Sequence, residues 1–151
     1  PIINKVRDRN TFLQTKDLMH TIDSAINEVV SEGPGSKRYL SPVLIKEGKL
    51  IIEPAGNKIF WEMETNAILQ QPQLQSDPAI VREGNLEMKL IEHPLIVDKY
   101  IISITLDYSN PGSGIYLSAS KKELVGKFSL SIYNIGIDPD SDLAIVKIDV
   151  L

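Results

Sequence analysis

This chain of 151 residues divides into one helical segment followed only by strand-like segments. From about Val6 to Glu32, apolar side chains recur at the spacing of one helix face. The residues of this stripe are Leu18, Ile22, Ala25, Ile26, Val29 and Val30. The helix is expected to stop at Gly33-Pro34-Gly35-Ser36, because glycine can adopt the left-handed conformation after the last turn and proline cannot extend a helix. We therefore predict a single N-terminal helix with one broad apolar face.

The start of this helix has two interpretations in the sequence. Thr11 followed by Gln14 fits a capping box, which would begin the helix there. In the alternative, the helix enters from upstream, and Val6, Leu13 and several charged residues form its solvent-facing first turns. These charged residues are Lys5, Arg7, Asp8 and Arg9.

Beyond Ser36, the apolar runs are short, rich in β-branched residues and separated by turn signals. The clearest strand covers 100–107, in which apolar and polar residues alternate and Tyr100, Ile102, Ile104 and Leu106 face one side. The predicted strand segments are 39–46, 50–53, 58–64, 80–81, 86–90, 100–107, 115–117, 128–132 and 143–151. Turns at this spacing are typical of an antiparallel sandwich.

Three details refine this prediction. Pro42 lacks a backbone N–H, so the run 39–46 is expected to be an edge strand or two short pieces. The residues 46–49 (Lys-Glu-Gly-Lys) indicate a hairpin turn into the strand 50–53. The Gln- and Pro-rich segment 68–78 is expected to be a loop that crosses between two sheets.

The predicted fold is therefore α+β, mainly β with one N-terminal α-helix. Residues 1–36 form the helix and its stop, and residues 37–151 form an antiparallel β-sandwich of about eight or nine strands. The helix is expected to pack on the sandwich, so that both parts make one folding unit. A chain of this length supports one core of useful size.

Composition excludes several function classes. The chain has no cysteine, which removes disulfides, thiolate metal sites and cysteine nucleophiles. Its net charge is −4, and Lys and Arg are scattered, so no basic stripe exists to neutralise nucleic-acid phosphates. The chain has no run of 18 apolar residues that could span a bilayer. The chain opens at Pro1 without a methionine, and we interpret this as a sign that a segment upstream of Pro1 has been removed.

The best metal candidate is the acidic turn that contains Asp138, Asp140 and Asp142, because alternating carboxylates can converge on calcium. An EF-hand loop needs glycine at its sixth position, where this chain has Leu143, and a helix afterwards, where a strand is predicted. We therefore favour a solvated turn whose aspartates cap backbone groups, and we predict no metal site.

No catalytic constellation is evident in the sequence. The two histidines, His20 and His93, have no serine and acid nearby that would make a triad, so both are expected to be surface residues. A group of glutamates lies on predicted strands and turns, where solubility charges are a simpler interpretation than paired catalytic carboxylates. These glutamates are Glu62, Glu64, Glu83, Glu87 and Glu92. We predict that the protein is not an enzyme and needs no cofactor.

Two glycine-rich motifs and an aromatic group complete the candidates. The segment 33–36 lacks the Gly-Lys-Ser/Thr ending of a phosphate loop, and 112–114 (Gly-Ser-Gly) lacks the context of a nucleophile elbow, so both are expected to be turns. Trp61, Phe60 and Tyr133 would make an aromatic binding patch, although strand alternation places either Phe60 or Trp61 in the core.

Residues 24–38 read Ser-Ala-Ile-Asn-Glu-Val-Val-Ser-Glu-Gly-Pro-Gly-Ser-Lys-Arg. This segment resembles the helix-to-strand junction of archaeal type IV pilin-like surface proteins, the group made with prepilin-type (class III) signal peptides. Such proteins have an Ala-Ile-x-Glu-Val helix end, a Gly-x-Gly-Ser stop and then strands. The resemblance runs from about Asp23 to Gly136. Its further segments are 56–61, 83–85, 100–108 and 133–136.

The resemblance implies an apolar membrane-anchoring helix upstream of Pro1 and a β-domain displayed at the cell surface. It therefore predicts a non-enzymatic structural protein, a pilin-like or minor-pilin-like subunit that contacts copies of itself or other envelope proteins. In this interpretation nucleic acid is not a partner, and the membrane is reached only through a segment absent from this chain. Two alternatives stay open: a soluble β-sandwich module that binds carbohydrate or protein, with calcium as a stabilising ion, and a stator-type accessory protein of the archaeal flagellum.

Overall fold

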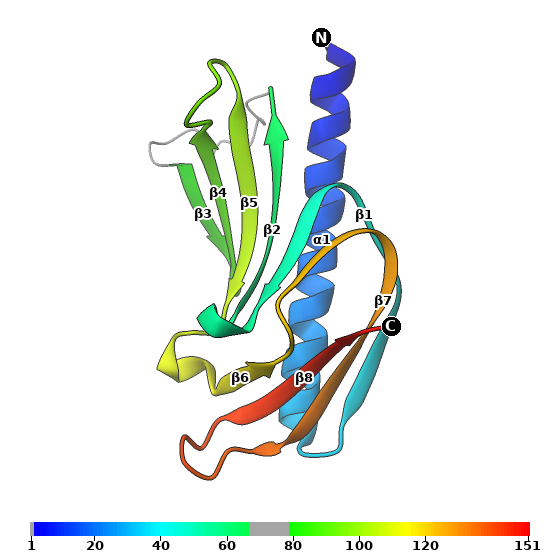
Figure 1. Cartoon of the computed structure of the whole chain (residues 1–151), viewed down its shortest axis with the longest axis vertical. Coiled ribbons are helices and arrows are strands. Elements are labelled where there is room, and N and C mark those ends of the chain that lie inside the picture. The colour runs from blue at the N-terminus through cyan, green and yellow to red at the C-terminus, as the bar shows by residue number, and fades with distance from the viewer. Residues whose placement is uncertain (1, 67–78) are drawn as a thin grey trace.

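The computed structural model describes residues 2–66 and 79–151 and is mainly β with one N-terminal helix, as predicted (Figure 1). The predicted loop 68–78 lies outside the described residues. Two short 3₁₀ turns, Pro54–Gly56 and Pro111–Ser113, join strands. The main elements are α1 (Ile2–Glu32), β1 (Lys37–Glu53), β2 (Lys58–Thr65), β3 (Ala79–Glu83), β4 (Leu86–Glu92), β5 (Tyr100–Asp107), β6 (Ile115–Ser118), β7 (Lys122–Ile137) and β8 (Ala144–Val150).

The described strands form one eight-stranded sheet in the order β3-β4-β5-β2-β1-β7-β8-β6. All neighbours are antiparallel except β6 and β8, which are parallel. The prediction of a purely antiparallel sheet is therefore wrong, and two stacked sheets are not confirmed. The parallel pair arises because β8 pairs with β7 on one side and with the earlier strand β6 on the other. Nothing in the short run 115–117 marks this choice of partner.

The strands β1 and β7 are much longer than the others and bend together (Figure 1). The first part of β1 (Lys37–Leu40 and Val43–Ile45) pairs with residues 126–133 of β7. Its last part, Leu50–Ile52, pairs with the first three residues of β7, Lys122–Leu124. Only Lys49–Glu53 of β1 also pair with β2. The first half of β1 thus has β7 as its one strand neighbour among the described residues, so the missing N–H of Pro42 costs no ladder bond on the other side.

The predicted hairpin turn at residues 46–49 is instead a bend inside β1. Gly48 adopts a left-handed conformation with φ +74° and packs directly on β2. The indole Nε1 of Trp61 donates a hydrogen bond of 2.9 Å to the carbonyl oxygen of Glu47. These contacts turn the chain through the bend without ending its pairing with β7, which a local turn signal cannot distinguish from a hairpin.

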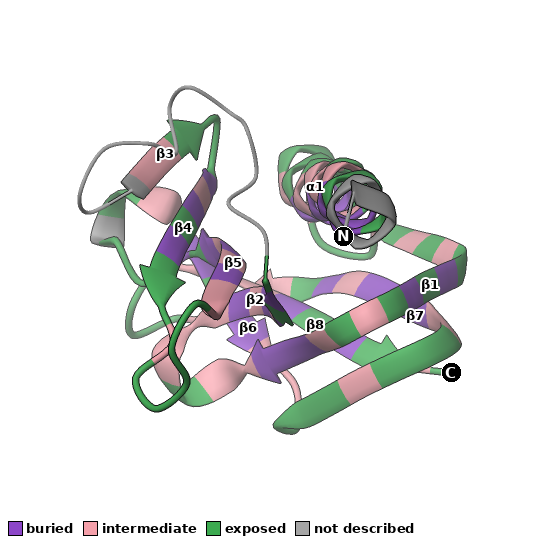
Figure 2. Ribbon diagram, turned by 90° about the horizontal axis from the view of Figure 1, so that it is seen from above, coloured by how far each residue is buried: buried purple, intermediate pink, exposed green. Residues whose placement is uncertain are grey.

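The helix α1 covers the inner side of the curved sheet (Figure 2). It contacts β1, β5, β7 and β8, and its buried side chains belong to the same cluster as those of the strands. From the N-terminal end, one row of buried positions follows alternating steps of four and three, and Thr11 and Ala25 are buried beside it. The row consists of Asp8, Phe12, Thr15, Met19, Ile22, Ile26 and Val29.

The helix begins upstream of Thr11, so the capping-box interpretation is wrong. Thr11 lies inside α1, where its carbonyl oxygen accepts a hydrogen bond of 2.8 Å from the Thr15 hydroxyl. The alternative interpretation is wrong about Asp8, whose residue is only 6% exposed. The Thr65 hydroxyl donates a hydrogen bond of 2.7 Å to Asp8 Oδ2, and this bond offsets part of the cost of burying the carboxylate. No helix among the described residues combines the length and the apolar character needed to cross a bilayer.

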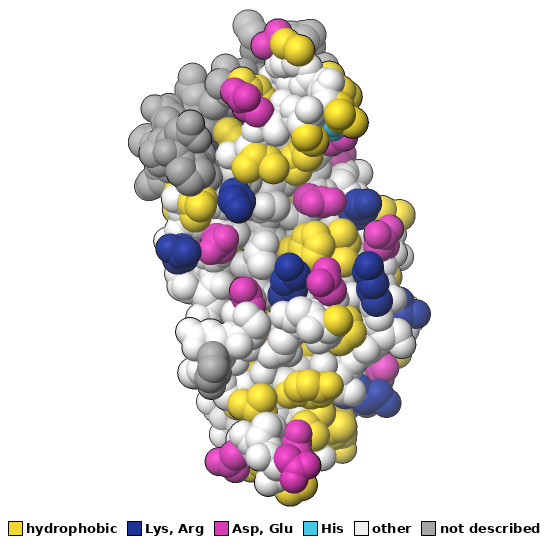
Figure 3. All heavy atoms as spheres, turned by 60° about the vertical axis from the view of Figure 1, so that its left-hand side comes forward, with side chains coloured by type: hydrophobic (Ala, Val, Ile, Leu, Met, Phe, Trp, Pro, Cys, Tyr) yellow, Lys and Arg dark blue, Asp and Glu magenta, His cyan; other side chains and the backbone are white. Residues whose placement is uncertain are grey.

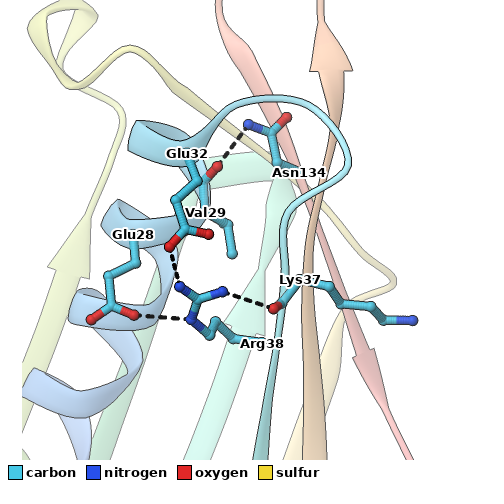
Figure 4. A network of polar contacts seen from close by, with 6 residues as sticks. All are labelled: Glu28, Val29, Glu32, Lys37, Arg38 and Asn134. Atoms are coloured by element: carbon cyan, nitrogen blue, oxygen red, sulfur yellow. Dashed lines mark hydrogen bonds and ion pairs between the residues drawn. The ribbon is translucent and has the colours of Figure 1, made fainter.

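Polar contacts fix the C-terminal end of α1 to the sheet (Figure 4). The buried Asn134 of β7 donates from Nδ2 to the Val29 carbonyl oxygen at 3.0 Å and accepts the Gly136 N–H at its Oδ1. On the other side of the helix end, Arg38 donates to the carboxylates of Glu28 and Glu32. The hydrogen bond from Arg38 lowers the pKa of the Glu32 carboxyl below its ordinary value.

Asn57 joins three segments that are far apart in the sequence. Its backbone has φ +54°, a conformation that asparagine tolerates better than most residues. Its Nδ2 donates to the carbonyl oxygens of Tyr108 and Ile115, and its Oδ1 accepts the N–H of Leu117. One side chain therefore connects the start of β2, the end of β5 and the strand β6.

The bend at Gly48 generates a prediction about stability. In Gly48→Ala, the new Cβ would press on the carbonyl oxygen of Glu62 and lie 2.8 Å from the Cβ of Met63. Backbone strain and this overlap together are expected to lower the free energy of unfolding by about 3 kcal/mol, as measured by urea denaturation. The matched control is Gly84→Ala, since Gly84 also has positive φ but no neighbour within 4 Å of a new Cβ. It should lose only about 1 kcal/mol, and equal losses at the two positions would contradict the crowding argument.

Candidate interaction surface

The acidic turn between β7 and β8 is organised by its own backbone. Asp138 Oδ1 accepts the N–H of Asp140 at 3.0 Å, and the Asp142 N–H donates to the Asp138 carbonyl oxygen at 2.8 Å. Asp142 itself has φ +62°. Among the described residues, no group of three or more His, Asp or Glu side chains is placed to hold a metal ion. Of the three aspartates, Asp138 caps a backbone group with its side chain, as expected of a turn.

His20 lies on the helix surface and pairs with a glutamate of β3. Its Nε2 is 2.9 Å from Glu83 Oε1, and Lys16 Nζ is 3.3 Å from the other oxygen of the same carboxylate. The hydrogen bond from His20, followed by that from Lys16, lowers the pKa of Glu83. This group ties α1 to the edge strand β3 and uses the carboxylate for ion pairing.

Of the remaining glutamates that the sequence singled out, Glu62 and Glu64 line one hollow, described below, whereas Glu87 and Glu92 are not part of its lining. Glu87 pairs with Arg82 within the β3–β4 hairpin at 3.1 Å, and Glu64 pairs with His93 and Lys99 at the other end of β5. Glu62 is half-buried and Glu92 is exposed.

The predicted aromatic group is divided between the two sides of the sheet. Trp61 is completely buried, as alternation required of one residue of the pair, whereas Phe60 is half-buried and has Lys58 Nζ 5.4 Å from its ring centre. Tyr133 has a different neighbour, Tyr39, which the sequence analysis overlooked. Lys37 Nζ lies 5.0 Å from the Tyr39 ring and 5.5 Å from the Tyr133 ring.

A buried tyrosine connects the helix to β5. Tyr108 is almost fully buried, and its hydroxyl donates a hydrogen bond of 2.7 Å to Asp23 Oδ1. The same carboxylate accepts from the side-chain amides of Asn27 and Asn85. Burial, and then the negative charge of Asp23, raise the pKa of Tyr108 far above its ordinary value. A strongly shifted group suggests a functional site, but here the phenol donates to the Asp23 carboxylate, which two amides also bind, and it thereby joins the helix to the sheet, which is a structural role.

Among the residues that the structure describes, the most exposed apolar group is the loop between β4 and β5. Leu95 is 88% exposed and Val97 is 87% exposed. Pro94, which precedes Leu95, and Ile96, which lies between the two, are also exposed. At the upper end of the face drawn in Figure 3, hydrophobic side chains gather beside acidic ones. We name residues 94–97 the apolar tip. A run of four exposed apolar residues is unusual on a surface that faces water and indicates a contact site.

The apolar tip is held in place by His93. The His93 Nδ1 accepts hydrogen bonds of 3.1 Å from the backbone N–H groups of both Leu95 and Ile96. Since an accepting Nδ1 carries no proton, the ring proton is on Nε2, which lies 3.1 Å from Glu64 Oε1 and donates to it. The His93 N–H also donates to the Lys99 carbonyl oxygen at 2.7 Å and closes the base of the loop. The sequence predicted His93 to be a surface residue, but its side chain is only 11% exposed, and nothing in the sequence marks the partners that enclose it.

Glu64 connects the base of this loop to β2. Lys99 Nζ lies 3.1 Å from Glu64 Oε2, and hydrogen bonds from Lys99 and then His93 lower the pKa of the Glu64 carboxyl. Next to this group, a shallow hollow of about 330 Å³ is lined by residues of β1, β2, β5 and β7. Its lining residues are Gly48, Lys49, Glu62, Met63, Glu64, Ile101 and Val125. The loop and the hollow share one end of the sheet, and together they make the candidate interaction surface.

The role of His93 is testable by hydrogen exchange. In His93→Ala, the amides of Leu95 and Ile96 lose their acceptor. At about 1 kcal/mol for each of two bonds, local opening should become on the order of 30-fold more frequent. Amide exchange measured by NMR would show faster exchange at these two positions. In the control His20→Ala, which removes the other histidine, both amides should keep the exchange rates of the unmodified protein, and an equal acceleration there would refute the assignment.

The Tyr108–Asp23 bond predicts a pH-dependent stability difference. Tyr108→Phe removes the hydroxyl and should cost about 1–2 kcal/mol at neutral pH. Because folding raises the pKa of Tyr108, this contribution is complete below the unfolded-state pKa of about 10 and decreases above it by about 1.4 kcal/mol per pH unit. Urea denaturation from about pH 8 to about pH 11 should therefore show the variant and the unmodified protein approaching each other. Tyr116→Phe, at an exposed tyrosine, should change neither stability nor its pH dependence.

Comparison of the chain with protein-family models, with curated proteins and with solved structures gave no match.

Proposed function

We propose that this chain is the displayed domain of a non-enzymatic cell-surface protein, a pilin-like or minor-pilin-like subunit that is anchored through a hydrophobic segment upstream of α1 and acts through protein–protein contacts. The observation that carries the proposal is the placement of α1. The helix is 31 residues long, about 46 Å at 1.5 Å per residue, and its N-terminal end lies at one end of the molecule (Figure 1). A chain continuing from it as helix would leave the domain along the helix axis.

The way in which α1 is attached also supports the proposal. The Asp23–Tyr108 bond and the Asn134–Val29 bond fix the middle and the end of the helix to the sheet. Such a helix suits a rigid connection between an anchor and a displayed domain, because a displacement of its N-terminal end would move the sheet with it.

The test is recovery of the full reading frame together with location of the native protein. We expect a short basic leader followed by about 20 apolar residues directly before α1, and we expect the native protein to fractionate with the cell envelope. Chemical crosslinking of intact cells should then give a ladder of multimers if the subunit assembles. A start codon at the position of Pro1, or a native protein found only in the soluble cell fraction, would defeat the proposal.

A second function is favoured by one observation, the tyrosine pair on β1 and β7. Tyr39 is 63% exposed, and Lys37 lies near its ring and near that of Tyr133. Exposed aromatic rings beside a cation suit the binding of a sugar or of a protein partner. The corresponding function is a soluble binding module, and Tyr39→Ala should then abolish retention on a glycan or protein ligand while leaving the unfolding free energy within about 0.5 kcal/mol of the original.

A further inference from the structure

The apolar tip combines exposure with a fixed conformation. The side chains of Leu95 and Val97 gain little from the fold, since they remain almost fully exposed, whereas Ile96 is 47% exposed. The backbone of the tip is nevertheless held by the two bonds to His93 Nδ1 and by the closing bond from the His93 N–H to the Lys99 carbonyl oxygen. When such a loop binds a partner, little conformational entropy is lost in ordering its backbone. A larger part of the free energy of burying its apolar side chains therefore contributes to binding.

The position of the tip indicates what it meets. The β4–β5 loop lies at the same end of the molecule as the N-terminal end of α1 (Figure 1). If the proposed anchor continues from that end, the bilayer faces this loop, whereas β6 and the β7–β8 turn lie at the far end (Figure 1).

The chemistry of the tip favours lipid chains over charged head groups. Residues 94–97 carry only aliphatic side chains, and the residues that flank them include the acidic Glu92 and Asp98 as well as Lys99. The flanks therefore offer no basic cluster that would bind anionic lipids. Leucine, isoleucine and valine side chains instead suit the boundary between head groups and acyl chains, as on the apolar face of an interfacial segment.

We propose that the apolar tip, Pro94 to Val97, inserts into the membrane surface and is a second attachment of the domain to the bilayer. This inference rests on the proposed function, because the upstream anchor is what holds the tip against the lipid. A few aliphatic side chains alone give only marginal, reversible binding, whereas two attachments together hold stably. Binding by the tip is expected to be independent of anionic lipid and of salt.

The experiment replaces the anchor by a synthetic tether. An N-terminal histidine tag holds the full chain on phosphatidylcholine vesicles that contain a small fraction of nickel-chelating lipid, and Leu95→Trp reports insertion by its fluorescence. The native Trp61 is completely buried and is subtracted with the unmodified protein. The matched control is Tyr116→Trp, at an exposed position of β6 at the opposite end of the molecule.

We expect emission from Leu95→Trp to shift to the blue on tethering and to be quenched by brominated acyl chains at least about threefold more strongly than emission from Tyr116→Trp. Adding Val97→Asp to Leu95→Trp should remove the difference, because a carboxylate opposes insertion. Far-ultraviolet circular dichroism of each variant shows that the fold is retained. Addition of salt, or of anionic lipid, should leave the quenching unchanged.

Equal quenching at the two positions would overturn the inference. A blue shift that depends on protein concentration in the absence of vesicles would overturn it too, since the tip would then bind a second copy of the chain. The synthetic tether keeps this test separate from that of the proposed function. A reading frame without an upstream anchor defeats the proposed function whatever the tip does, and absence of quenching defeats the lipid contact even where an anchor exists.

Discussion

The packing of α1 against the curved sheet is the interaction on which the rest of the structure depends. A sheet with one apolar face needs a second layer to exclude water from it. Among the described residues no second sheet supplies that layer, and the helix side chains from Phe12 to Val29 do so instead. The long strands β1 and β7 bend around the helix, so that strands at both ends of the sheet share one buried cluster with it. Removing the helix would expose buried side chains of β1, β5, β7 and β8, the strands that it contacts.

Directional contacts determine how the helix sits on that face. Apolar packing alone would permit α1 to slide or rotate, because such contacts have no preferred direction. Tyr108 donating to Asp23 and Asn134 donating to the Val29 carbonyl oxygen fix two points along the helix. Buried polar groups of this kind are costly unless they are satisfied, and the described residues leave no buried side-chain polar atom without a partner. The interface is therefore specific in position as well as stable.

Local signals predicted the elements well and their assembly less well. Glycine and proline at 33–36 located the end of α1, and alternation in 100–107 gave the buried side of β5 correctly. The bend at Gly48 was mistaken for a hairpin, since the same residues suit both and the difference lies in the distant Trp61. The sequence also failed to predict the parallel pairing of β6 and the exposure of residues 94–97. Both depend on contacts with residues that are distant in the sequence. A buried Asp8 contradicts the simple rule that charges face water, and its hydrogen bond from Thr65 and its ion pair with Arg7 explain it.

The three hydrogen bonds of Asn57 have a consequence for assembly. An outermost strand with free backbone groups is a template on which another chain can extend the sheet. On β6, the Ile115 carbonyl and the Leu117 N–H that would begin such an extension are already bound to the Asn57 side chain. This flank of the molecule is thereby blocked to a foreign strand. Copies of the protein that meet there would have to recognise each other through their side chains, which keeps association selective and disfavours growth by continuous β-augmentation.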